Sequence, residues 1–338
     1  MNETASKDPQ RRGIQKQAAG LGLTLILGLV ACAPGGSAAT TTTPGTPAGT
    51  GISATIAIGT LMTDDILPLW AAVDDGSAAA AGLTLKIQTF TSAQEQTAAV
   101  TAGQVDAIMT DMVVPVQLTA SGTPMRAVTR LQGAPAGIVA GKDSGLTSLA
   151  DLAGIETGCS TPTIMEYIYD KALKDAGVPD DQVKTSEIKN LSVRLQMLTS
   201  GGIKAAVLPW TLHSLAVSQG ATSLLGVEQA SSYSSTVLAF RDAWLKGRPD
   251  TDAVMAALMT VWDAEVAKIN AAPEKYRTLL AAQAKLPAPL DQTYTVRQYP
   301  THAIPDQAQF EAVVTWMVSK GYIKSAIAYD DLVWSGAK

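Results

Sequence analysis

A twelve-residue pattern occurs twice in the chain, at residues 101–112 and 199–210. In both copies a helical run reaches a glycine, the residue favoured just past a helix end because it adopts positive φ. A short alternating apolar segment with the period of a strand follows the glycine. The two copies then end in unlike residues, Asp111 in one and Trp210 in the other. Because ligands bind outside the carboxyl ends of strands in open α/β sheets, the repeat predicts two similar lobes that each aim a strand end outward.

The composition limits the classes of function that the chain can have. A length of 338 residues suggests two domains or one large one, and 46% hydrophobic with 16% charged residues is typical of a globular protein. A net charge of -5 argues against nucleic acid as a partner. The two cysteines and two histidines show no zinc spacing, and no Gly-rich phosphate loop occurs. We therefore expect no metal, no cofactor and no catalytic residues.

The N-terminus has the order of features of an export signal. Arg11, Arg12 and Lys16 precede a charge-free stretch at 18–31, which is too short for a comfortable membrane span of ~20 residues. The stretch ends at Cys32 in a pattern that resembles the lipobox of bacterial lipoproteins, whose cysteine carries a diacylglyceryl group and a further acyl chain such as palmitate. We predict a lipoprotein signal peptide over residues 1–32, with an ordinary signal peptide as the alternative. Arg11 and Arg12 leave twin-arginine export open beside the general route.

The segment that follows the signal reads as a tether. Residues 33–51 are mostly Ala, Thr, Gly, Pro and Ser, and no charged residue occurs between Cys32 and Asp64. Such a segment cannot bury enough apolar surface to order itself. We therefore expect a flexible tether that holds an exported body by a lipid anchor, on the outer face of the cell membrane or on its periplasmic side.

The body alternates strands and helices, which predicts parallel strands and βαβ crossovers. The first lobe has strand patterns at 52–58, 83–90, 105–109 and 125–131. Aspartate is a good helix N-cap, so the first helix is expected to begin at Asp64 or Asp65, and a capping box opens at Ser92. A second lobe repeats this order of strands and caps: another capping box opens at Thr163, and a further cap is Asn190. A strand at 233–240 then returns to the first lobe, where three C-terminal helices with broad apolar stripes pack.

Four segments give the chain a resemblance to the periplasmic substrate-binding proteins of ABC importers. They are Leu-Pro-Leu-Trp-Ala at 67–71, Ala-Gly-Gln-Val-Asp-Ala at 102–107, Ser-Leu-Ala-Asp-Leu-Ala-Gly at 148–154 and Pro-Trp at 209–210. They are similar to the branch that handles nitrate, sulfonates, taurine and thiamin-pyrimidine precursors.

The resemblance implies two mostly parallel α/β lobes joined by two crossing strands, with a small ligand in the cleft and hinge-like closure. It implies a first lobe formed by residues 52–139 and 236–338 and a second formed by residues 140–235. It also implies a monomer that delivers its ligand to the permease and ATPase subunits of the importer.

The resemblance carries ligand-binding positions onto the strand ends of both lobes. These positions are Thr63, Asp64, Asp65, Thr91, Ser92, Thr110 and Asp111 in the first lobe, and Ser160, Thr161, Thr163, Asn190 and Trp210 in the second. Ser92 and Thr163 have a simpler alternative as helix caps only, and Trp210 has one as a core residue.

The acidic residues near these loops favour a neutral or cationic ligand. Basic residues are scarce there, while Asp64, Asp65, Asp111 and Glu166 lie close by in sequence and would repel an anion. A pyrimidine-type or flavin-type vitamin precursor fits, because aspartate accepts ring N–H donors and Trp210 could stack on a heterocycle. The alternative is a sulfonate, taurine or nitrate receptor. A sensory receptor and a pyrimidine-synthase-like enzyme are further alternatives, and the absence of a cysteine cluster argues against the enzyme.

Overall fold

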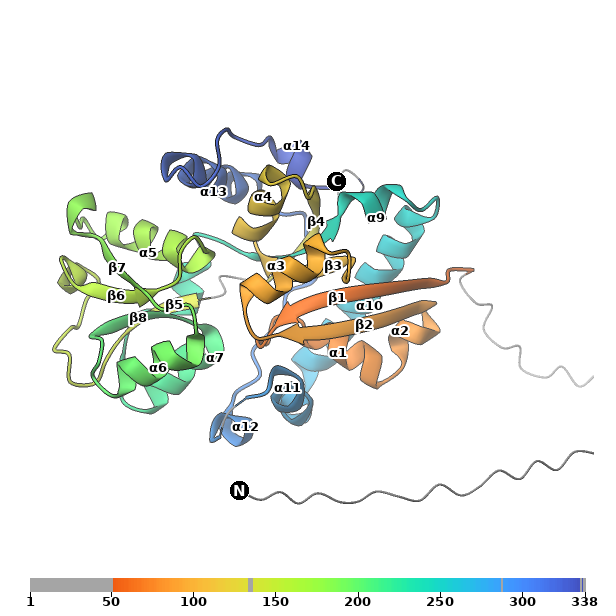
Figure 1. The fold of residues 1–338 in the computed structure, drawn as a ribbon. Helices are drawn as coiled ribbons and strands as arrows, with labels where there is room; N and C mark the ends of the chain where they lie inside the picture. Colours follow the sequence, from red (N-terminus) through yellow and green to blue (C-terminus); the bar gives the residue numbers. More distant parts are fainter. Residues whose placement is uncertain (1–50, 133–135, 287, 335, 337–338) are drawn as a thin grey trace, which may run out of the picture. The chain divides into compact units, whose positions relative to one another are not determined.

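The computed structural model describes residues 51–132, 136–286, 288–334 and 336. In this part of the chain two five-stranded sheets are each flanked by helices (Figure 1). The expected signal peptide, the lipidated Cys32 and the tether up to residue 50 lie outside the described residues. Within them, no helix combines the length and the apolar character that crossing a membrane requires.

The first sheet has the strand order β2-β1-β3-β10-β4. Its strands are β1 (Ala54–Leu61), β2 (Leu83–Phe90), β3 (Ala107–Asp111), β4 (Met125–Gln132) and β10 (Thr236–Arg241). β1 pairs in parallel with β2 and β3, whereas β10 lies antiparallel between β3 and β4. Four strands therefore run one way, and the strand that returns from the distant part of the chain runs the other way.

The second sheet repeats this arrangement position by position, in the order β7-β6-β8-β5-β9. Its strands are β5 (Ala136–Ala140), β6 (Glu156–Cys159), β7 (Lys184–Glu187), β8 (Ala205–Pro209) and β9 (Thr222–Leu225). β6 is parallel to β7 and β8, and β5 lies antiparallel between β8 and β9. β5 thus has the place in this sheet that β10 has in the first. The two-lobed α/β fold is confirmed, and the expected boundary after residue 139 falls inside β5.

The helices fall into two groups by the sheet they follow. The first lobe carries α1 (Leu67–Asp74), α2 (Ser77–Ala80), α3 (Ala93–Thr101), α4 (Val113–Ala120), α9 (Asp242–Lys246), α10 (Thr251–Ala271), α11 (Arg277–Ala284), α12 (Leu290–Thr293), α13 (Gln307–Ser319) and α14 (Tyr329–Leu332). The second lobe carries α5 (Ile164–Asp175), α6 (Leu191–Thr199), α7 (Trp210–Ser218) and α8 (Val227–Ala230).

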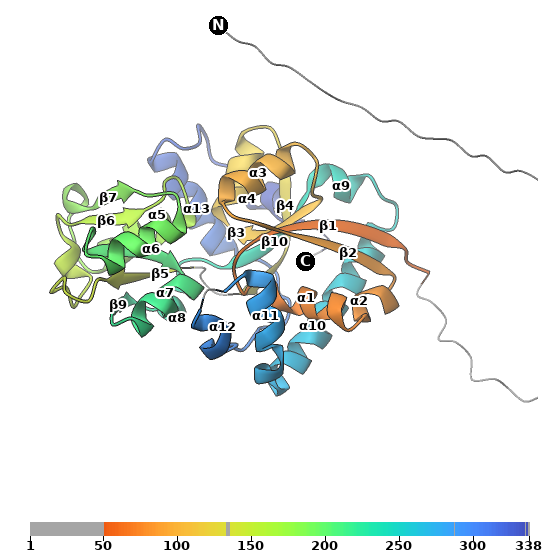
Figure 2. The same ribbon diagram turned by 60° about the horizontal axis from the view of Figure 1, so that its bottom comes forward.

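Alternate residues of each central strand pack on opposite sides of the sheet, as a doubly covered sheet requires. In β3, Ala107 and Met109 join the core formed with α1 and α10, while Ile108 joins the core formed with α3, α4 and α13. In β8, Val207 packs with α5, and its neighbours Ala206 and Leu208 pack toward α6 and α7. Figure 2 shows the helices on both sides of the two sheets.

The repeat in the sequence is the same structural unit in both lobes. α3 is followed by Gly103 with φ 72°, and α6 is followed by Gly201 with φ 77°. After α3, the N–H of Gly103 donates to Val100 O at 2.9 Å and that of Gln104 donates to Ala99 O at 2.8 Å. These two bonds form the Schellman motif that a left-handed glycine permits. The glycine therefore ends the helix and turns the chain into β3 or β8, as predicted.

Candidate functional site

The predicted site residues of the first lobe lie at one edge of its sheet. β1, β2 and β3 run parallel, so their carboxyl ends meet at this edge. The residues there are Thr63, Asp64, Asp65, Thr91, Ser92, Thr110 and Asp111. We call this edge, with these residues, the first edge.

The predicted residues of the second lobe share the equivalent edge of the second sheet. β6, β7 and β8 are parallel and end at Cys159, Glu187 and Pro209. The residues that follow are Ser160, Thr161, Thr163, Asn190 and Trp210, and we call this group the second edge.

Two contacts join the lobes near these edges. The side chain of Gln117 on α4 donates from Nε2 to the carbonyl oxygen of Pro162 at 3.2 Å. The guanidinium of Arg297, in the segment after α12, lies 5.6 Å from the centre of the Trp210 ring. The structure therefore brings residues of both edges toward one another, with Arg297 between them.

The two aspartates that follow β1 share one arginine. The Asp64 carboxylate, which is 1% exposed, accepts from Arg297 Nε at 2.7 Å and Nη2 at 2.9 Å and from Tyr294 Oη at 2.7 Å. Asp65 Oδ1 accepts from Arg297 Nη2 at 3.2 Å. Burial, and then the neighbouring Asp64 carboxylate, raise the pKa of Asp65 to about 6. The expectation that an aspartate caps the first helix is wrong, because α1 begins at Leu67 without a side-chain cap.

The Asp111 side chain bonds to the first turn of the next helix, α4. Its Oδ1 accepts from the N–H groups of Val113 at 2.7 Å and Val114 at 3.3 Å, which are free donors in the first turn of α4. Burial raises the pKa of Asp111 to about 6 against the effect of these bonds. Thr110 beside it is a buried strand residue opposite Val237 of β10.

Three other predicted residues cap helices with their side chains. Ser92 accepts from Glu95 N at 3.2 Å, Thr163 accepts from Met165 N at 3.2 Å, and Asn190 accepts from Val193 N at 3.0 Å. The caps of α3, α5 and α6 are thus confirmed.

Two threonines next to these caps bond to carboxylates instead. Thr91 donates from its hydroxyl to Glu95 at 2.7 Å, and Thr161 donates from its hydroxyl to Glu187 at 2.8 Å. Thr63 lies beside Asp65 and lowers the pKa of that carboxyl through a hydrogen bond, although burial and Asp64 outweigh this effect.

A buried cation that the sequence did not single out, Arg194, contacts Ser160 of the second edge. Arg194 on α6 is 0% exposed, and its guanidinium donates to Ile188 O at 2.9 Å, to Val207 O at 2.7 Å and to the hydroxyl oxygen of Ser160. Among the ion pairs of the described residues, none joins Arg194 to a carboxylate. Burial lowers its pKa, but arginine stays protonated in proteins. Because Ser160 accepts from a cation, its own O–H proton is polarised and directed elsewhere.

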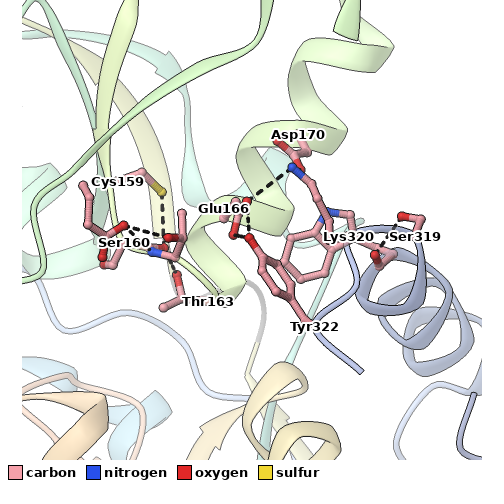
Figure 3. A network of polar contacts seen from close by, with 11 residues as sticks. Cys159, Ser160, Thr163, Glu166, Asp170, Ser319, Lys320 and Tyr322 are labelled. Carbon is pink, nitrogen blue, oxygen red and sulfur yellow. Dashed lines mark hydrogen bonds and ion pairs between the residues drawn. The ribbon is translucent and has the colours of Figure 1, made fainter. Parts of the chain in front are cut away.

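Glu166, which sequence analysis placed among the acidic residues near the ligand, contacts the C-terminal segment instead. Tyr322 Oη donates to both carboxylate oxygens at 2.9 Å, and Lys320 Nζ lies 3.3 Å from Glu166 and 2.7 Å from Asp170 (Figure 3). Its charge is therefore partly compensated. In the described residues no group of three or more His, Cys, Asp or Glu side chains is arranged to hold a metal ion.

The two lobes define a two-lobed α/β fold with polar residues at the strand ends of each lobe, and comparison with known proteins gives the family. Residues 63–272 match the family described as NMT1/THI5 like. The chain belongs to this family. Comparison with curated protein sequences gives no match.

Solved structures with the same fold come from several organisms. The periplasmic aliphatic sulphonate-binding protein SsuA of Escherichia coli is 15% identical, with a TM-score of 0.71 over 83% of this chain and 92% of that one. The periplasmic nitrate-binding protein NrtA of Synechocystis is 16% identical, with a TM-score of 0.63 over 81% of this chain and 83% of that one. The desulfurization enzyme DSZB is 15% identical, with a TM-score of 0.61 over 84% and 97%. At these identities the likeness establishes the periplasmic-binding-protein fold.

Proposed function

We propose that this chain is the exported solute-binding protein of an ABC importer, anchored by lipid at Cys32, and that its ligand is a small organic anion of the sulfonate type. Relatives in fold that bind sulphonate or nitrate support this class of ligand. The permease and ATPase of the importer are its partners, and the membrane is reached through the lipid.

The observation that carries the proposal is the pairing of Arg194 with Ser160. A buried charge is normally matched by an opposite charge, because desolvation costs several kcal/mol per ion. Arg194 has neutral acceptors and lies under the loop that begins with Ser160. The Ser160 hydroxyl and the N-terminus of α5 then face an anion with donors, which is how helix N-termini and polarised hydroxyls bind oxyanions.

The acidic residues that favoured a vitamin precursor repel an anion less than their number suggests, because they have partners within the protein. Asp64 is paired with Arg297, and Asp111 bonds to the first turn of α4. Arg297 and the first turn of α4 therefore weaken, without removing, the repulsion that these carboxylates exert on an anion. The pyrimidine-type or flavin-type heterocycle remains the competing ligand class, which titration distinguishes from the sulfonate.

A binding role rather than catalysis is supported by the chemistry of Cys159. This thiol is fully buried beside the second edge, and burial raises its pKa to about 12. Nucleophilic thiol chemistry needs a thiolate, so Cys159 is inert at neutral pH.

Isothermal titration calorimetry with ethanesulfonate, taurine, nitrate and a pyrimidine tests the proposal. We expect a sulfonate to bind with a Kd on the order of 1 µM. Ser160→Ala should weaken that binding about tenfold, because it removes a hydrogen bond to a charged group. The matched control is Ser232→Ala, an exposed serine of the second lobe whose hydroxyl bonds to Gln229 O. Pyrimidine binding without sulfonate binding would contradict the proposed ligand.

A further inference from the structure

Arg297 connects the acid pair of the first edge to the aromatic residue of the second. Its Nε and Nη2 are held by Asp64 at 2.7 and 2.9 Å, and Nη2 also reaches Asp65 at 3.2 Å. Its side chain is 20% exposed. This fork geometry fixes the guanidinium plane, and the same guanidinium lies 5.6 Å from the centre of the Trp210 ring.

The Trp210 ring also has a partner on its own helix. It stacks on the imidazole of His213 with a centroid distance of 5.7 Å and an interplanar angle of 12°. Burial lowers the pKa of His213 to about 4, so the imidazole is neutral at physiological pH. The indole is therefore held by an arginine from one lobe and a histidine from the other.

The indole N–H of Trp210 is buried and has no hydrogen-bond acceptor among the described residues. Buried polar groups in folded proteins are almost always hydrogen-bonded, and each exception calls for an explanation. A donor at the end of β8, the strand whose Val207 carbonyl oxygen accepts from the buried Arg194, fits an acceptor oxygen that arrives with a ligand. The buried guanidinium of Arg194 makes a negatively charged acceptor the favoured one.

We propose that Trp210 binds the ligand through its indole N–H, which donates to an oxygen of the anion, and that Arg297 is the positioning residue that orients the indole. This inference rests on the proposed function. It assigns the N–H edge of the ring to the ligand rather than a face, because the ring already contacts His213 and Arg297. The role differs from the stacking on a heterocycle that the sequence suggests.

Trp210→Phe separates the two roles of the side chain. Phenylalanine keeps an aromatic face for Arg297 and His213 but removes the N–H. We expect the Kd for ethanesulfonate, measured by calorimetry on the full chain, to rise about ten- to a hundredfold, as for loss of a hydrogen bond to a charged group. In a ¹H–¹⁵N spectrum the six tryptophans give six indole signals. The signal missing in Trp210→Phe should be the one that moves most when ethanesulfonate is added to the unmodified protein.

Trp244→Phe is the matched control, because Trp244 also carries an arginine, with Arg248 5.2 Å from its ring. This variant should bind ethanesulfonate with unchanged affinity.

Arg297→Lys tests the positioning role, because it keeps the charge but loses the paired Nε and Nη2 bonds to Asp64. It should therefore weaken binding and shift the Trp210 indole signal before ligand is added.

The outcomes separate this inference from the proposed function. If the unmodified protein binds ethanesulfonate and Trp210→Phe binds it equally well, the inference is wrong and the proposed function stands. If the unmodified protein binds no sulfonate, both are overturned.

Discussion

The two arginines near the candidate site are compensated in opposite ways. Arg297 has two carboxylates as partners, whereas Arg194 has main-chain carbonyls and a hydroxyl. At the first edge Arg297 is paired with Asp64 and Asp65, whereas beside the second edge the buried Arg194 forms no ion pair among the described residues. This asymmetry between two lobes of equal topology is a property of single residues.

Removing Arg297 should destabilise the fold as well as the site. Arg297→Gln leaves the Asp64 carboxylate buried with Tyr294 as its remaining side-chain partner, which we expect to cost about 3 kcal/mol of unfolding free energy. Urea denaturation measures this loss. Adding Asp64→Asn should recover much of it, while Arg248→Gln, at a half-exposed pair with Asp250, should cost less than about 1 kcal/mol. Equal losses for both arginines would contradict the assignment.

Anion binding should strengthen as the pH falls. The pKa of Asp65 and of Asp111 is raised to about 6, so both are largely ionised at pH 7.5 and largely neutral at pH 5. Loss of these charges removes repulsion of an anionic ligand, and the expected gain in affinity between these pH values is several-fold. His213 does not contribute, because its pKa of about 4 keeps it neutral over this range. Calorimetry at several pH values tests this, and Asp111→Asn should make the affinity less dependent on pH. An affinity that decreases as the pH is lowered would instead favour a cationic ligand.

The sequence could predict residue types at the site better than their partners. The caps at Ser92, Thr163 and Asn190 depend on neighbours within four residues, which a sequence shows directly. The partner of Asp64 lies more than 200 residues away, and no local pattern relates it to Arg297. The sequence therefore shows which residues near the site are acidic but not the cation that pairs with Asp64.

At the scale of elements, local sequence rules predict where the helices of the repeat end and where the strands that follow them lie. The glycine after α3 and the glycine after α6 mark where each helix ends, and the strand that follows has the expected period. What local rules missed is the start of α1, because the buried pair with Arg297 takes Asp64 out of a capping role. Tertiary contacts override local preference wherever a charge must be buried.

Alanine at the second helix-ending glycine should cost stability through the backbone alone. Gly201 has φ 77° and a Cβ there would meet no atom within 4 Å, so Gly201→Ala is strained without a clash. We expect a loss of about 1–2 kcal/mol in unfolding free energy. Gly201→Asn should cost less, because asparagine tolerates the left-handed region. Thermal or urea denaturation of the two variants gives the comparison, and equal costs would point to a different cause.

At the scale of the whole molecule, the C-terminal segment joins the two lobes on the side of α13. Trp316 Nε1 donates to Asp170 at 2.8 Å, and Lys320 and Tyr322 bond to Glu166 on the same helix, α5. α13 itself packs with α4 of the first lobe. A segment far from the strand ends therefore ties α5, whose N-terminus follows Ser160, to the opposite lobe.

Loosening this tie should be visible in α5. Lys320→Met removes the cation between Glu166 and Asp170, and we expect amide hydrogen exchange in α5 to rise about fivefold, corresponding to about 1 kcal/mol. Exchange in α7 should stay unchanged. The control is Lys171→Met, which breaks an exposed pair with Asp175 on the same helix. Exchange mass spectrometry reads both helices, and an equal effect of the two variants would contradict a role between lobes.

The place of β10 bears on the order in which the molecule can assemble. β10 lies between β3 and β4, yet it is encoded about 100 residues after β4. A chain that is synthesised from its N-terminus contains β1 to β4 before β10 has been made, so the position between β3 and β4 is still empty. The inner edges of β3 and β4 then remain unpaired until the whole second lobe has been made, and unpaired edges invite wrong partners. The two lobes are thus equal in topology but unequal in timing: the lobe that begins first is the one that finishes last.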